Sequence, residues 1–163
     1  TGNFEYTKVG GYILSQILGA GLGAFLVRTF YKDHFDSTEN SGEIQACFCT
    51  SPAIKNKYRN LWSEIFGTFI FIFAILNMTS AANSLGSLDA LPAGLLVLGI
   101  GLSLGGTTGY AINPARDLGP RIAHALLPIK NKGDNGWSYS WIPFFGPVIG
   151  ALLAAGIFNL MVV

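Results

Sequence analysis

An Asn-Pro break between two hydrophobic segments carries the residues best suited to chemistry. The stretch Gly109–Asp117 reads GYAINPARD and holds one positive and one negative charge. Irregular polar backbone at membrane depth is tolerated only where it is packed in protein or lines a water-filled cavity, and a charge there marks a functional site. The stretch therefore predicts a pore or binding site inside a membrane protein.

The residues after the break predict a short helix that begins at it. Asn113 suits the N-cap, Pro114 the first helical position and Asp117 the first turn, while Pro128 lies beyond the end. A helix of about 114–126 is too short to cross a bilayer, which takes about 20 residues. We therefore expect a half-helix whose N-terminus carries unpaired N–H groups and about half a unit of positive charge.

Several groups around the break are candidates for contact with a small polar solute. The oxygen of Asn113 can cap the helix while its NH2 group serves a hydroxyl, and Arg116 offers fixed donors whose charge opposes protons and metal ions. The carbonyls of Gly109, Tyr110 and Ala111 have no helical partners, so we expect a ladder of acceptors along a pore. The Tyr110 ring would add an aromatic wall.

Other polar residues are expected to support the pore. Asp117 and Arg121 are four residues apart and can pair on one helix face, a structural role. Glu64 is either an interfacial carboxylate without a role or a buried acceptor for the N–H groups of the break, which are costly to leave unpaired in a bilayer. The same two interpretations stay open for Gln16.

Composition places the chain among membrane proteins. Its 163 residues are 50% hydrophobic and only 12% charged, with a mean hydropathy of +0.45, whereas soluble domains average about 25% charged residues. A net charge of +1 gives no basic surface for nucleic acid. Four segments can span a bilayer, about 9–31, 61–80, 91–109 and 141–163. Trp137, Tyr139 and Trp141 are expected to form an interfacial aromatic belt.

The remaining polar features predict no chemistry. The segment 32–60 carries acidic residues first and basic ones later, and we expect a solvated loop. Cys47 and Cys49 are too close for an easy mutual disulfide, and without a Cys/His cluster they are read as loop cysteines, with no metal or cofactor site. Because no strand precedes the glycines of 99–106, we read them as helix-packing positions.

At these residues the sequence resembles the aquaporin, or major intrinsic protein, family. Gly109–Arg121, with its Asn113-Pro114-Ala115 core, looks like the second Asn-Pro-Ala loop and half-helix. Trp141–Gly150 resembles the start of the last span, Tyr12–Gln16 the third span and Glu64–Thr68 the fourth. The resemblance implies an all-α membrane protein and a partial helical bundle, with four spanning helices and one re-entrant half-helix of the family's six plus two.

The resemblance favours the glycerol-facilitator branch of the family. That branch has an acidic residue at Asp117, a basic one at Arg121 and a proline at Pro143. Gly101 stands where water channels place a constricting His, and Tyr110 stands where glycerol channels place a Phe. We therefore expect an opening that suits a carbon chain bearing hydroxyls.

The implied function is a passive channel for glycerol, other small neutral solutes and water. Residues 1–163 would be the C-terminal part of one channel domain, a fragment from the third span onward, and the first two spans and first Asn-Pro-Ala loop would be missing. The resemblance further implies a homotetramer in a bacterial plasma membrane. A secondary transporter with broken helices and a closed structural membrane protein stay open. An enzyme is not indicated, because no nucleophile–base pair or metal set is visible.

Overall fold

The computed structural model describes residues 4–78 and 85–162, and within these ranges every regular element is a helix. The expectation of an all-α protein is therefore confirmed. The elements in chain order are α1 Tyr6–Phe30, α2 Lys32–Ser37, α3 Ser41–Ala46, α4 Lys57–Met78, the 3-10 helix η2 Gly86–Leu88, α5 Ala90–Thr108, α6 Pro114–Leu126 and α7 Trp141–Val162.

Among the described residues, four helical segments are long and apolar enough to cross a membrane: Tyr6–Phe30, Lys57–Met78, Gly86–Thr108 and Trp141–Met161. The second begins four residues before the expected start at 61. The reason is a local cap, since the Asn56 carboxamide oxygen accepts a hydrogen bond from the Arg59 backbone N–H at 3.1 Å. Residues 79–84, where this segment was expected to end, lie outside the described residues.

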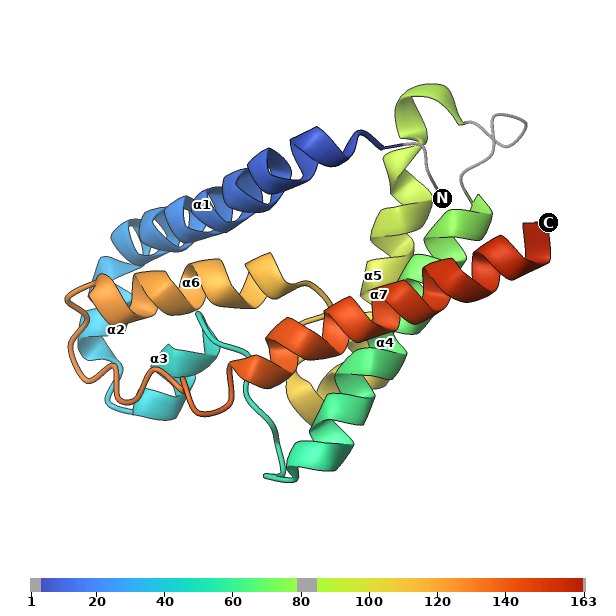
Figure 1. Ribbon diagram of the computed structural model, residues 1–163. Coiled ribbons are helices and arrows are strands. Elements are labelled where there is room, and N and C mark those ends of the chain that lie inside the picture. The colour runs from blue at the N-terminus through green and yellow to red at the C-terminus, as the bar shows by residue number, and fades with distance from the viewer. Residues whose placement is uncertain (1–3, 79–84, 163) are drawn as a thin grey trace.

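Two of the main helix pairs join elements that are distant in the sequence, and a third joins the consecutive long helices α4 and α5. α6 lies along α1, α4 crosses α7, and α5 packs against α4 (Figure 1). Small residues permit these approaches, as is usual in membrane bundles. A Cβ atom on Gly119 of α6 would lie 2.6 Å from the Ile17 carbonyl oxygen of α1, and one on Gly146 of α7 would lie 2.6 Å from the Glu64 Cβ of α4.

The segment between α1 and α4 keeps most of its charged side chains exposed, as expected of a solvated loop, but part of it is packed. It contains α2 and α3, and its apolar side chains form one buried cluster with residues of α6 and the following turn: Phe35, Ile44, Phe48, Cys49, Ala123 and Ile129. These side chains are spaced irregularly among charged ones, so no hydrophobic period revealed them.

The two cysteines are free, and they differ in environment. Cys47 is exposed and Cys49 is buried in the cluster. Burial raises the pKa of the Cys49 thiol to about 11, which keeps it protonated and unreactive near neutral pH. Cys49 is therefore a packing residue.

Candidate functional site

The half-helix α6 occupies the expected range and begins with the expected cap. Asn113 has an extended backbone, and its side-chain oxygen accepts a hydrogen bond from the Ala115 N–H at 2.9 Å. Pro114 fills the first helical position. Because the oxygen makes the cap, the NH2 group of Asn113 remains available as a donor.

The segment before α6 is irregular and strained. α5 ends at Thr108, and its C-cap residue Gly109 has a φ of 78° and donates its N–H to the Gly105 carbonyl at 2.9 Å. Tyr110 and Ile112 also have positive φ, 40° and 42°, a region that costs a non-glycine residue about 1–3 kcal/mol. Such a segment persists only where its surroundings hold it.

The carbonyl groups of this segment face no protein donor. In the described part of the chain, no hydrogen bond reaches the carbonyl oxygens of residues 109–111. These oxygens are therefore free to accept a hydrogen bond from water or a solute. The acceptor ladder along a pore stays a prediction.

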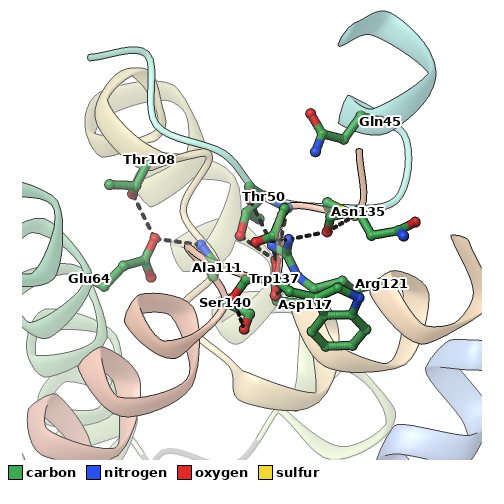
Figure 2. A network of polar contacts seen from close by, with 12 residues as sticks. Gln45, Thr50, Glu64, Thr108, Ala111, Asp117, Arg121, Asn135, Trp137 and Ser140 are labelled. Atoms are coloured by element: carbon green, nitrogen blue, oxygen red, sulfur yellow. Dashed lines mark hydrogen bonds and ion pairs between the residues drawn. The ribbon is translucent and has the colours of Figure 1, made fainter. Parts of the chain in front are cut away.

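Glu64 holds the segment from behind, as the second of its two interpretations predicted (Figure 2). Its side chain on α4 is 1% exposed. One carboxyl oxygen accepts from the Thr108 hydroxyl at 2.6 Å and the Ala111 N–H at 3.0 Å, and the other accepts from the Ile112 N–H at 2.9 Å. One carboxyl group thus fixes both sides of the strained Tyr110.

Asp117 and Arg121 form the expected pair, and Arg121 is completely buried. The guanidinium donates to both Asp117 oxygens at 2.8 Å. Its remaining donors reach the carbonyls of Thr50 at 2.9 Å, Asn135 at 2.7 Å and Gly136 at 2.9 Å (Figure 2). The pair therefore ties α6 to Thr50, before α4, and to Asn135 and Gly136, between α6 and α7.

Cationic side chains hold the far end of α6. The Lys132 ammonium donates to the carbonyls of His124, Ala125 and Leu127 at 2.8–2.9 Å, and Arg28 of α1 donates to the Pro128 carbonyl at 2.8 Å. Positive charge is favourable at a helix C-terminus. Both ends of the half-helix are thus fixed.

A cleft of about 430 Å³ opens beside the start of α6. Five of the predicted residues line it together: Tyr110, Ala111, Asn113, Pro114 and Arg116. The opposite wall comes from α4, α5 and α7 and is mainly apolar, with Phe71, Ile72, Val97, Val148 and Ala151. A polar edge therefore faces a hydrocarbon wall.

Gly101 and Gly109 do not line this cleft. Gly101 instead makes room for the Tyr110 ring, since a Cβ there would lie 3.1 Å from the ring's Cζ atom. Gly105, read from sequence as a packing position, does the same, with its Cβ 2.7 Å from the ring's Cδ1 atom. The Arg116 guanidinium also lies over the Tyr110 ring, 5.6 Å from its centre.

Two further predicted residues, Gln16 and Ala115, do not line the cleft. Gln16 is exposed on α1, and its side chain has no hydrogen bond in the described part of the chain. The structure therefore does not bring it to the broken segment. Ala115 is buried in the first turn of α6 and takes part through its backbone N–H.

The aromatic belt is only partly as expected. Trp137 and Trp141 are 45% and 37% exposed, as suits an interface. Tyr139 instead turns inward, and its buried hydroxyl has no hydrogen-bond partner in residues 4–78 and 85–162. Burial raises the pKa of this hydroxyl.

The sequence also gave no signal for Thr50 and Thr108, the two hydroxyl residues that complete the buried networks. Thr50 donates to the Asp117 carboxyl group, 67 residues away, and Thr108 donates to the Glu64 carboxyl group, 44 residues away. No local pattern records such a distant partner.

Comparison with known proteins places this geometry in a family. A model of the major intrinsic protein family matches residues 1–158. A glycerol uptake facilitator protein of Streptococcus pneumoniae is 53% identical over 159 residues, which cover 98% of this chain and 68% of the relative. A probable glycerol uptake facilitator protein of Thermotoga maritima is 52% identical over 159 residues, 97% of this chain and 67% of the relative.

A solved structure shows the same fold. The X-ray structure of the aquaglyceroporin from Plasmodium falciparum superposes with a TM-score of 0.82 and 28% identity, over 96% of this chain and 65% of that one. The chain thus spans about two thirds of the length of the proteins it matches. Both comparisons and the Asn-Pro-Ala half-helix agree, and the chain belongs to the major intrinsic protein family.

Proposed function

We propose that the full-length protein is a passive transmembrane channel for glycerol, other small neutral solutes and water. The cleft carries this proposal, because it sets the Asn113 amide and the Arg116 guanidinium against an apolar wall. Glycerol needs hydrogen-bond partners for its hydroxyls and apolar contact for its carbons, and the cleft offers both. The names of the two glycerol facilitator relatives support the same solute.

The same proposal covers the protein's organisation. Residues 1–163 contribute one part of a single channel domain, and the complete protein lies in the plasma membrane as a homotetramer. The four long apolar helices support the membrane placement. Transport is downhill, with Asn113, Arg116 and the carbonyls of Tyr110 and Ala111 replacing the solute's hydration.

Entry of glycerol into vesicles tests the proposal. Vesicles that hold the full-length protein should take up glycerol faster than empty vesicles, without saturation at moderate concentration and without an ion gradient. Saturating uptake that depends on an ion gradient would favour a secondary transporter, which also uses broken helices. Uptake equal to that of empty vesicles would indicate a closed structural protein.

Arg116 is expected to exclude cations from the cleft. Two like charges about 8 Å apart repel by about 2 kcal/mol at an effective dielectric constant of about 20. Arg116→Ala should therefore raise the leak of protons or potassium roughly thirtyfold, measured as the decay of an imposed gradient in vesicles. Arg116→Lys keeps the charge and should stay close to the wild type. An unchanged leak in the alanine variant would contradict this role.

A further inference from the structure

A second pocket, of about 280 Å³, lies where α4 and α7 begin. It shares no lining residue with the cleft. Its deepest residues are Asn60 and Ile142, which are 5% and 0% exposed. Its outer edge carries the exposed side chains of Lys55 and Lys57. The pocket is therefore a separate polar feature with a buried base and a basic rim.

The charge of this pocket is positive. Lys55 and Lys57 supply two cations, and neither is in an ion pair within the described ranges. Asp134 supplies the lining's carboxylate, and one of its oxygens accepts a hydrogen bond from the Gly136 N–H at 3.1 Å. The pocket thus keeps an excess of positive charge.

The polar groups around the lysines suit an oxyanion. The first residues of α4 and α7, Lys57 and Trp141, both line the pocket, so the positive ends of two helix dipoles add to its potential. Ser51 and Ser138 place hydroxyl groups in the same lining. Ammonium groups, hydroxyls and helix N-termini together are the groups that bind phosphate in proteins.

The surroundings place the pocket at the depth of lipid headgroups. α4 and α7 are two of the helices able to cross a membrane. Near their starts, Tyr58 is 89% exposed and Trp62 is 64% exposed, and Trp137 and Trp141 are also exposed. Exposed Tyr and Trp at the ends of spanning helices mark the membrane interface. A pocket beside these helix starts is therefore expected near the level of lipid phosphates.

We propose that this pocket binds the phosphate group of an anionic lipid headgroup. Basic pockets between spanning helices take such headgroups, because each lysine near an anionic surface adds attraction. The site is independent of the proposed channel function, since it lies outside the cleft and involves none of the residues assigned to solute passage.

Lipid binding to the full-length protein in a neutral detergent tests the proposal. Short-chain phosphatidylglycerol, short-chain phosphatidylcholine and inorganic phosphate are titrated separately, and bound molecules are counted by native mass spectrometry. The protein should prefer phosphatidylglycerol to phosphatidylcholine about tenfold. Lys55→Gln combined with Lys57→Gln should abolish the preference, and each single variant should lose part of it.

A matched control separates the pocket from general surface charge. Arg59→Gln combined with Lys130→Gln also removes two positive charges, but from exposed residues outside the pocket lining. This variant should keep the preference for phosphatidylglycerol. The proposal is overturned if the wild type shows no preference, or if the control loses as much as the pocket variant. Inorganic phosphate that binds as tightly as phosphatidylglycerol would indicate a soluble-anion site and would also overturn it.

Discussion

Replacing Glu64 by glutamine should lower glycerol permeation at least about tenfold and destabilise the protein by about 2 kcal/mol. The carboxyl group accepts from Thr108, Ala111 and Ile112. Glutamine keeps the shape of the glutamate side chain but has only one acceptor oxygen. Its NH2 group would therefore lie against one of these hydrogen-bond donors and could not accept from it. The strained backbone at Tyr110 and Ile112 would then lose the contacts that hold it.

The measurement is glycerol entry into vesicles, normalised to the amount of folded protein, together with the free energy of unfolding. Thr108→Val is the matched control, because it removes one of the three hydrogen bonds and leaves both backbone bonds to Glu64 in place. Its cost should be about 1 kcal/mol, with a smaller loss of permeation. Wild-type permeation in the glutamine variant would show that Glu64 does not hold the conducting segment.

Replacing Arg121 by methionine should destabilise the protein by about 3–5 kcal/mol. Methionine matches the length of the arginine stem but leaves the Asp117 carboxylate buried without its partner. It also removes the donors to the Thr50, Asn135 and Gly136 carbonyls. We expect the chain around Thr50 and around Asn135 and Gly136 to separate from α6. The midpoint of denaturant unfolding should fall as a result.

A double variant shows whether the charge pair itself is responsible. Asp117→Asn combined with Arg121→Met removes both charges while the asparagine oxygen can still accept from the Thr50 N–H. The two changes should couple by at least about 1 kcal/mol. Arg59→Met, an exposed arginine, is the control and should change stability by less than about 0.5 kcal/mol. Strictly additive effects in the double variant would contradict a coupled pair.

The half-helix could be predicted from the sequence because its signals are local. Asn113, Pro114 and Asp117 are cap and first-turn residues within five positions, and the structure puts each in its expected place. The Asp117–Arg121 pair is one helical turn apart and was equally readable. Glu64 was left between two interpretations, because its partners are 44 to 48 residues away.

Features that depend on tertiary packing could not be predicted from the sequence. The burial of Phe35, Ile44 and Phe48 depends on how α2 and α3 fold back onto α6, and no period in the sequence encodes it. Gly101 was identified as an opening, but its space is shared with the Tyr110 ring. Tyr110 itself has a positive φ, a backbone conformation that residues other than glycine rarely adopt.

The assignment of the cleft as the solute pathway is tested most directly by blocking the space between α6 and the apolar residues of α4, α5 and α7. Val148 of α7 lines the cleft, whereas its neighbour Ile149 does not, and the two are 40% and 39% exposed. In vesicles with the full-length protein, Val148→Trp should lower glycerol entry at least about tenfold, and Ile149→Trp should leave it near the wild-type rate. Equal glycerol entry through the two variants would contradict the assignment of this cleft as the solute pathway.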